Sequence, residues 1–421
     1  MDYINKELKK GIKFHFIKND KFKTNLIAIF LTTPLDRKGV TKNALIPAIL
    51  RRGSAFLNTQ DKISKTLEEM YGAVFDCGID KKGENQVLKF YIEVVNDEFL
   101  PNEAENLYQK SLKMIFDIVF NPLIEDDSFN IEYLEQEKSN LNQVIEAKKD
   151  NKARYALERC MEEVNKDMPS GLYKYGYSED LDGIDSKNLY SHYQELISKC
   201  KIDIFVSGKL EENQAEKNIE NLVKDLKERE PNFIKTEYKE VNDIKEKEIQ
   251  ESLEVTQGKL VLGMKVKNIA EKEQYATMLY NSILGGSANS KLFQNVREKA
   301  SLAYTASSSY MRLSNEIFIN SGIEIENYQK ALDIIRKQLE DMKKGDFTDE
   351  EIENAKKGII SAIEAIDDEQ DSEIMYFFGQ EFFENVSSLE EYKENIQKVT
   401  REQIIDIANK VCISVIYFLR D

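Results

Sequence analysis

Residues 292–310, LFQNVREKASLAYTASSSY, join a helical segment to a strand. The apolar positions of the first part have the spacing of one helix face: Leu292, Phe293, Val296 and Ala300. Ser301 ends that pattern, and from Leu302 on β-branched and aromatic residues take over and the period drops towards two. The pattern predicts a helix that ends near Ala300 and a strand that begins near Ala303.

Two hydrogen-bond donors flank this predicted corner. Arg297 falls on the last helical turn, and Tyr304 falls at the head of the strand. A guanidinium and a phenol at one corner can hold the carbonyl groups of a peptide or stabilise an oxyanion. The same two residue types also suit an ordinary corner, with an Arg on the surface and a Tyr half in the core, so the local pattern leaves both interpretations open.

The sequence repeats the order of its predicted elements. A shift of 229 positions places residues 67–75 over 296–304 and the following strand, 88–93, over 317–322. A shift of 218 positions places residues 135–147 over 353–365, and both segments end in Ile-Glu-Ala. Two matches in the same order, with matching element types, predict a duplicated domain.

The predicted fold class is α+β. Strands occur as hairpins and helices occur in runs, which favours two homologous domains, each a mostly antiparallel sheet with helices packed on one face. We expect domains at residues 1–229 and 250–421, a charged linker at 230–249, and a clamshell with its ligand in the seam. Other predicted elements include a helix over 41–52 that Pro47 kinks, one long helix over 127–166 and a loop over 169–185.

The composition excludes several classes of partner. The 421-residue chain carries a net charge of −17, which disfavours nucleic acid and anionic membranes. It has no apolar run long enough to span a bilayer and no signal-peptide pattern at its start. The four cysteines, Cys77, Cys160, Cys200 and Cys412, form no CxxC pair, so we expect a cytoplasmic protein with core thiols.

The chain has two histidines, which restricts its metal chemistry. His15 lies in a predicted strand and His192 in a predicted helix, and neither has a Glu, Asp or Cys at ligand spacing. The sequence therefore predicts no histidine-based metal site in this chain. It also lacks a Ser-His-Asp or Cys-His arrangement.

The sequence resembles the insulinase-type (M16) metallopeptidase family in its bacterial two-domain form. The resemblance rests on KELKKGIKFHFIKN at 6–19 and GGSANSKLFQNVREKASLAYTASSSY at 285–310, together with the duplicated halves. Active members of that family bind zinc through an H-x-x-E-H helix and a distant Glu, which leaves one coordination position open for water.

In this chain the matching positions carry other residues. The two histidine positions are Ala44 and Ala48, the general base is Pro47, and the distant ligand is Val144; Glu137 matches an upstream family Glu. The resemblance therefore implies no catalytic residue, no bound metal and no peptidase activity from this chain alone.

Arg297 and Tyr304 match the pair that active members direct at the substrate. The resemblance thus implies a non-catalytic, substrate-binding subunit of a heterodimeric zinc metalloendopeptidase, with zinc and H-x-x-E-H in the partner and a peptide as substrate. The alternative is a peptidase-like scaffold or a maturation factor, for example in modification of elongation factor P. Pairing of the isolated chain with a second copy stays open.

Overall fold

The computed structural model describes residues 2–100, 106–236, 244–383 and 386–421 of the chain. The chain forms two compact units, and neither is continuous in sequence. Unit 1 comprises residues 1–146, 172–235 and 367–382, and unit 2 comprises residues 147–171, 236–366 and 383–421. Each sequence half therefore contributes one segment to the unit that is built mainly from the other half.

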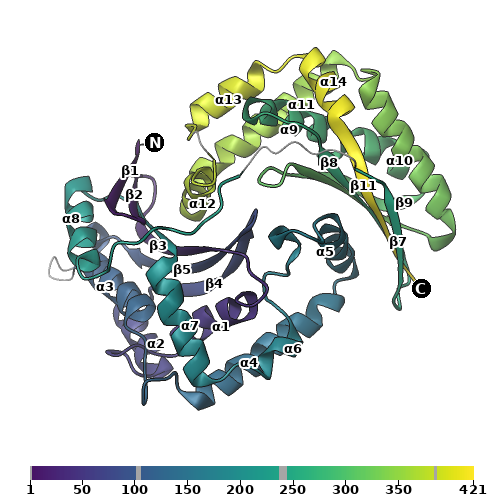
Figure 1. Ribbon diagram of the computed structural model, residues 1–421. Helices are drawn as coiled ribbons and strands as arrows, with labels where there is room; N and C mark the ends of the chain where they lie inside the picture. The colour runs from purple at the N-terminus through teal and green to yellow at the C-terminus, as the bar shows by residue number, and fades with distance from the viewer. Residues whose placement is uncertain (1, 101–105, 237–243, 384–385) are drawn as a thin grey trace. The chain divides into compact units, whose positions relative to one another are not determined.

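Unit 1 contains a six-stranded sheet, drawn in purple to teal in Figure 1. Its strands are β1 (Asp2–Lys9), β2 (Ile12–Lys18), β3 (Thr24–Pro34), β4 (Val74–Lys82), β5 (Asn85–Val95) and β6 (Lys201–Gly208). Their order is β1-β2-β6-β3-β5-β4, and only the β2–β6 pairing is parallel.

Most helices of unit 1 pack on one face of this sheet. They are α1 (Val40–Leu50), α2 (Gln60–Glu69), α3 (Leu107–Phe120), α4 (Ile131–Glu146), α6 (Ser178–Leu181), α7 (Ser186–Lys199) and α8 (Glu212–Val223). Ile27 and Ile29 of β3 point into the core beneath them. Because side chains alternate along a strand, Phe30 points to the opposite face, where it stacks on Phe378 of α12 (Gln370–Gln380) at 4.2 Å.

Unit 2 contains a five-stranded sheet. Its strands are β7 (Lys247–Ser252), β8 (Gly258–Val266), β9 (Ala303–Met311), β10 (Glu316–Ile323) and β11 (Val411–Arg420). Their order is β7-β11-β8-β10-β9, and only the β7–β11 pairing is parallel. The helices are α5 (Lys152–Val164), α9 (Gln274–Gly285), α10 (Tyr328–Lys343), α11 (Asp349–Glu364), α13 (Leu389–Gln397) and α14 (Arg401–Lys410), with a π-helix at Phe293–Lys299.

Helix α5 covers one face of the second sheet. Its residues Tyr155, Cys160 and Val164 form a buried cluster with Val261 and Phe318 from the strands. Gly263 of β8 makes this approach possible, since a Cβ atom there would lie 2.4 Å from Val164 Cγ2 and 3.1 Å from Cys160 Sγ.

The two sheets have the same topology. The order β2-β6-β3-β5-β4 corresponds strand by strand to β7-β11-β8-β10-β9, and β1 is an additional edge strand of unit 1. The repeat offsets match the element starts, because β4 and β9 begin at Val74 and Ala303, and α4 and α11 begin at Ile131 and Asp349. The predicted α+β fold with two homologous, mostly antiparallel sheets is confirmed.

Several details of the prediction were wrong. The long helix predicted over 127–166 is two helices, because a 3₁₀ turn at Ala147–Lys149 follows α4 and the Asn151 side chain caps α5 by accepting from Arg154 N at 3.0 Å. In the described residues, a helix also lies on the second face of each sheet, α12 on the first sheet and α5 on the second, whereas the sequence predicted helices on one face. The loop predicted over 169–185 contains α6, and β1 and α8 were not predicted.

The predicted linker at 230–249 lies partly outside the described residues, at 237–243, and its last three residues belong to β7. The predicted domain boundaries and the clamshell stay predictions. In the described part of the chain, no helix combines the length and apolar character needed to cross a bilayer.

Candidate functional site

The positions that the sequence resemblance matched to the zinc site of active family members lie on α1 and α4, which pack against each other in unit 1. Ala44 and Pro47 are buried and Ala48 is half-buried on α1, while Val144 is 45% exposed on α4. Helix α1 continues through Pro47 to Leu50. None of the four side chains offers an atom that can bind a metal or move a proton.

Glu137 of α4 is committed to a different contact. Its carboxylate is buried and accepts a hydrogen bond from Arg52 Nε at 2.6 Å and from Asn140 Nδ2 at 3.1 Å. The Arg52 guanidinium also lies over the Tyr133 ring, 5.6 Å from its centroid. The matched family Glu therefore serves as an anchor between the end of α1 and α4.

His192 lies beside α1 but has no role as a ligand there. Its Nε2 donates to Asn43 Oδ1 at 2.7 Å, and Asn43 Nδ2 donates to Gln86 Oε1 at 2.9 Å. Burial lowers the pKa of His192, so the ring is neutral near pH 7. This hydrogen-bond chain is consistent with the structural role that the sequence predicted.

The corner between the π-helix and β9 has the geometry that the sequence predicted. Ser301 takes a left-handed conformation, with φ of 51°, and Ser301 N and Leu302 N donate to the carbonyls of Arg297 and Val296 at 3.1 Å each. Tyr304 stands 71% exposed at the head of β9. A π-helix and a left-handed serine at one corner are features that recur at functional sites.

Arg297 has few contacts of its own. Its guanidinium lies over the Phe293 ring, 4.4 Å from the centroid, and its Nε lies 3.6 Å from a Glu298 carboxylate oxygen. The side chain is 42% exposed. Arg297 and Tyr304 thus belong to one exposed corner of unit 2, with donors available to a ligand, whereas the four positions on α1 and α4 belong to unit 1.

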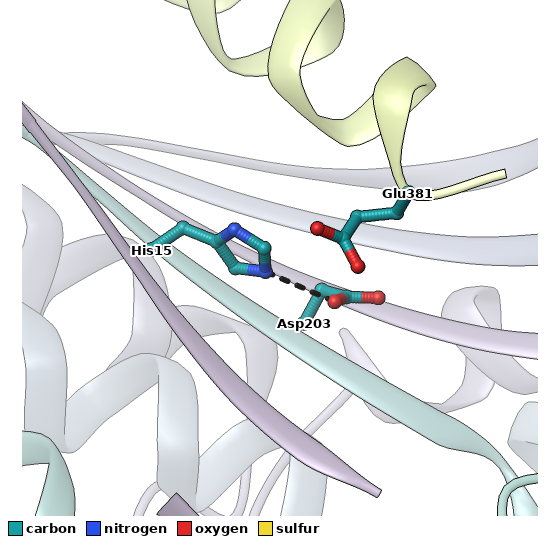
Figure 2. Close-up of side chains that lie close together, drawn as sticks. All are labelled: His15, Asp203 and Glu381. Atoms are coloured by element: carbon teal, nitrogen blue, oxygen red, sulfur yellow. Dashed lines mark hydrogen bonds and ion pairs between the residues drawn. The ribbon is translucent and has the colours of Figure 1, made fainter. Parts of the chain in front are cut away.

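The structure also brings together three residues that the sequence did not connect. His15 of β2, Asp203 of β6 and Glu381, which follows α12, place their ligand atoms within 4.8 Å of one another in unit 1, and all three are buried (Figure 2). His15 Nε2 lies 3.0 Å from Asp203 Oδ1, and Tyr3 Oη lies 2.8 Å from His15 Nδ1. We call this group, together with Lys13 and Lys201, the β2–β6–α12 cluster.

Two ammonium groups occupy the place that a metal ion would take in this cluster. Lys201 Nζ donates to Asp203 Oδ1 and, at 3.0 Å, to Glu381 Oε2. Lys13 Nζ donates to Glu381 Oε1 at 2.7 Å. A cation bound among these carboxylates would have to displace Lys201, so the donor set does not fit a metal site.

The protonation states agree with a charge-balanced cluster. Burial lowers the pKa of His15 more than Asp203 raises it, so the ring is neutral. Burial alone would raise the pKa of Asp203, but Lys201 and His15 outweigh it and lower that pKa. Two carboxylates thus face two lysines around a neutral imidazole.

Comparison with known proteins places the chain in a family. It is 35% identical over 426 residues to the probable inactive metalloprotease YmfF of Bacillus subtilis, across 100% of this chain and 99% of that one. The chain belongs to the M16 peptidase family. Within it, this M16 homologue is of the inactive type, since residues 183–359 match the family described as Peptidase M16 inactive domain.

Solved structures share the fold over the whole chain. A conserved protein from Enterococcus faecalis superposes with a TM-score of 0.89 at 27% identity, covering 100% of this chain and 99% of that one. A peptidase M16 inactive domain from Pseudomonas fluorescens gives a TM-score of 0.81 at 19% identity, covering 100% and 98%.

Some relatives are named as zinc proteases. The uncharacterized zinc protease YmxG of Bacillus subtilis is 33% identical over 106 residues, which is 25% of this chain and 26% of that one. At the positions that the sequence resemblance matched to the zinc site, 44, 47, 48 and 144, alanine, proline and valine supply none of the donors that catalytic zinc requires. No step of zinc chemistry follows from this chain.

Proposed function

We propose that this chain is the non-catalytic, substrate-binding subunit of a two-chain M16 zinc metallopeptidase that acts on peptides. The observation that carries the proposal is the contrast between two places in the chain. Ala44, Pro47, Ala48 and Val144 offer no metal donor, whereas Arg297 and Tyr304 keep both donors on an exposed corner. A scaffold would have no use for that pair.

The partner would be an M16 chain that has H-x-x-E-H and binds the zinc. Bacillus subtilis has both a full-length relative named as inactive and a relative named as a zinc protease, which supports a division of labour between two chains. Arg297 and Tyr304 would donate to the carbonyl groups of a bound peptide. The Phe293 ring would hold the Arg297 guanidinium in place through their cation–π contact.

We place this assembly in the cytoplasm. The described cysteines are all free thiols, and Cys160 and Cys200 are buried in the two cores. Burial raises the pKa of the Cys200 thiol to about 12, so the group is a packing residue with little tendency to form a disulfide.

The test is a peptidase assay with zinc on a broad peptide mixture. It compares this chain alone, its H-x-x-E-H partner alone, and both together. We expect cleavage from the mixture only, and at least a tenfold loss when Arg297→Ala and Tyr304→Phe are combined. A matched variant, Arg420→Ala with Tyr71→Phe, changes an exposed Arg and an exposed Tyr elsewhere and should keep full activity.

Complex formation is measured in parallel by size-exclusion chromatography. If the partner cleaves equally well alone, or the two chains never associate, the half-site proposal is wrong and the scaffold or maturation-factor interpretation replaces it. If the double variant cleaves as well as the unaltered pair, the Arg297–Tyr304 corner has no part in substrate binding.

A further inference from the structure

Helices α5 and α12 are equivalent members of the two sequence repeats. The shift of 218 positions that relates α4 to α11 also places the start of α5, Lys152, over the start of α12, Gln370. The buried positions coincide as well, since Ala156, Cys160 and Val164 fall over Ile374, Phe378 and Phe382, and all six are buried. Yet α5 packs in unit 2 and α12 in unit 1.

Each of these helices therefore lies on the sheet of the other sequence half. The equivalent arrangement, with α5 on the first sheet and α12 on the second, would place homologous helices on homologous sheets without any exchange. The two helix–sheet contacts differ in chemistry at the three positions compared below.

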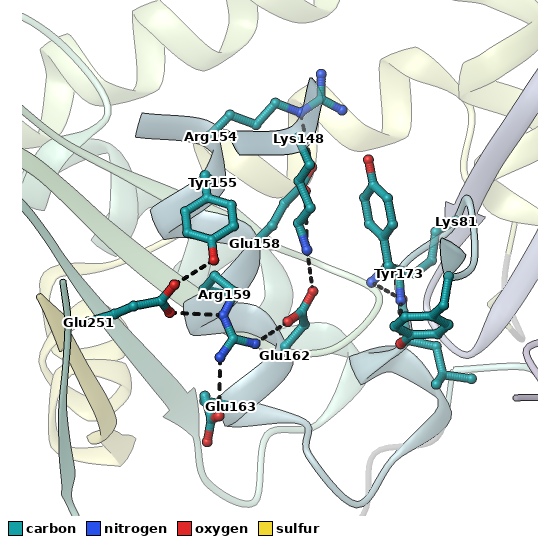
Figure 3. A network of polar contacts seen from close by, with 12 residues as sticks. Lys81, Lys148, Arg154, Tyr155, Glu158, Arg159, Glu162, Glu163, Tyr173 and Glu251 are labelled. Atoms are coloured by element: carbon teal, nitrogen blue, oxygen red, sulfur yellow. Dashed lines mark hydrogen bonds and ion pairs between the residues drawn. The ribbon is translucent and has the colours of Figure 1, made fainter. Parts of the chain in front are cut away.

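On the second sheet, α5 meets a carboxylate. Glu251 of β7 accepts hydrogen bonds from Tyr155 Oη and, at 3.2 Å, from Arg159 Nε (Figure 3). Tyr417 of β11 donates to the same carboxylate at 2.7 Å. Next to this polar contact, Cys160 lies against Gly263, where an added Cβ atom would be 3.1 Å from the sulfur.

On the first sheet, α12 meets aromatic rings. Phe378 stacks on Phe30 at 4.2 Å and packs edge-on against Phe205, and Phe377 stacks on Tyr3 with 3.8 Å between centroids. Asn19 Nδ2 donates to the buried Glu373 carboxylate at 2.6 Å.

Helix α12 would fit poorly on the second sheet. Its Glu373 would take the place of Tyr155 and set a second carboxylate against Glu251. Its Phe378 would take the place of Cys160, whose sulfur lies so close to the sheet that even a Cβ atom added at Gly263 would be 3.1 Å from it.

Helix α5 would fit poorly on the first sheet. Its Arg159 would take the place of Phe377 and lose the stacking on Tyr3. Its Cys160 would take the place of Phe378 and leave a cavity beside Phe30. The carboxylate of Glu381 does not distinguish the helices, because Glu163 occupies the equivalent position of α5.

We propose that the pairs Tyr155/Glu373, Arg159/Phe377 and Cys160/Phe378 direct α5 and α12 each to the sheet of the opposite sequence half, so that the two halves are binding partners of each other. The interaction surfaces are the face of the second sheet around Glu251 and Gly263 and the face of the first sheet around Phe30 and Phe205. The covalent connection through 237–243 is then dispensable once the chain has folded.

The first test cuts the folded chain. A specific protease site is placed within 237–243 of the full-length protein, the purified chain is cleaved under native conditions, and the product is diluted and run on a size-exclusion column. We expect the two fragments to elute together, with the Cys160 thiol as unreactive toward a thiol reagent as in the uncut chain. Separation of the fragments on dilution, or a Cys160 that stays protected in a separated first fragment, would overturn the exchange.

The second test asks whether the named side chains direct the exchange. In the same cleavable chain, Glu251→Arg faces Arg159 with a like charge, and we expect the fragments to dissociate at least tenfold more readily. Adding Arg159→Glu restores the opposite charges and should recover most of the association. If Glu251→Arg had weakened association only by general misfolding, a second substitution would not restore it.

A matched control exchanges two exposed α5 residues for their α12 counterparts, Ala153→Asp with Arg154→Ser. It should associate like the unaltered chain. If Glu251→Arg behaves like this control, or if the charge reversal fails to restore association, the side chains do not direct the helices and the proposal is wrong.

Discussion

Lys201 donates to Glu381 at 3.0 Å across 180 positions of sequence, and this contact ties the end of α12 to the middle of the first sheet. The lysine also neutralises Asp203, whose Oδ2 has no hydrogen-bond partner among the described residues. The Lys201 ammonium therefore contacts two buried carboxylates on two elements that are remote in the chain, and Lys13 contacts one of them, Glu381.

Removal of that ammonium should destabilise unit 1 strongly. Lys201→Met keeps the length of the side chain but leaves Asp203 and Glu381 without their shared cation, and breaking a buried ion pair in this way costs about 3–5 kcal/mol. Urea unfolding followed by circular dichroism measures the loss. Lys398→Met, which breaks an exposed pair with Glu394, is the control and should cost less than about 1 kcal/mol. Equal effects would show that the cluster does not hold α12.

The β2–β6–α12 cluster should bind zinc only after Lys201 has been replaced. Because Lys201 occupies the space between the two carboxylates, micromolar zinc or a chelator should leave the melting temperature of the unaltered chain unchanged. Lys201→Ala frees His15, Asp203 and Glu381 as a donor set, and zinc should then raise the melting temperature of this variant. Zinc-dependent stabilisation of the unaltered chain that His15→Gln abolishes would instead identify a metal site.

Glu373 should make unit 1 sensitive to pH. Burial raises the pKa of Glu373 to about 7, and Asp367 adds to this shift, while Asn19 and Lys21 oppose it. The folded chain thus keeps this proton up to about pH 7, whereas the unfolded chain loses it near the ordinary Glu value. This group therefore reduces stability progressively as the pH rises from about 4.5 to 7.

The variant Glu373→Gln removes that loss. Urea titrations at pH 5, 6, 7 and 8 measure the free energy of unfolding of the variant and of the unaltered chain. The difference, variant minus unaltered chain, should increase with rising pH and level off above pH 7. The control Glu68→Gln, at an exposed position, should show no such trend. A difference that stays constant with pH would contradict the raised pKa.

Replacement of Gly263 by a larger residue should lower the free energy of unfolding, because a side chain there would overlap α5. Gly263→Ala places a Cβ atom 2.4 Å from Val164 Cγ2, and such overpacking costs about 1–3 kcal/mol. Val164→Ala in the same chain should recover part of the loss by making space. Gly358→Ala on α11, where an added Cβ meets nothing within 4 Å, should be neutral or stabilising by up to about 1 kcal/mol. Urea unfolding compares the three variants.

Local pattern and repetition were enough to predict most elements and both sheets. The apolar face and the shift to a period of two around Ser301 predicted the corner of Arg297 and Tyr304, and the offsets of 229 and 218 anticipated the shared topology. Asn151, a strong capping residue, was the available signal that the helix predicted over 127–166 would end early.

The exchange of α5 and α12 between the two sheets could not be predicted from local pattern or repetition. Each helix has an apolar face, but the sequence pattern does not indicate which sheet that face covers, and only the contacts in space show it. The β2–β6–α12 cluster left a fainter signal. Lys13 and His15, and likewise Lys201 and Asp203, alternate with apolar residues in buried strands, which marks one polar stripe on a covered face. Its third partner, Glu381, could not be inferred from spacing.

The exchange of helices also sets the order in which the protein can mature on the ribosome. All strands of the first sheet have been synthesised by Gly208, but α12, which covers Phe30 and Phe205, is complete only at Gln380, roughly 170 residues later. At about 5–20 residues per second, this aromatic face stays without its cover for roughly ten to thirty seconds. A nascent chain of this length is therefore a natural client for chaperones that bind exposed aromatic surface, and its need for them should end when Glu381 reaches Lys201.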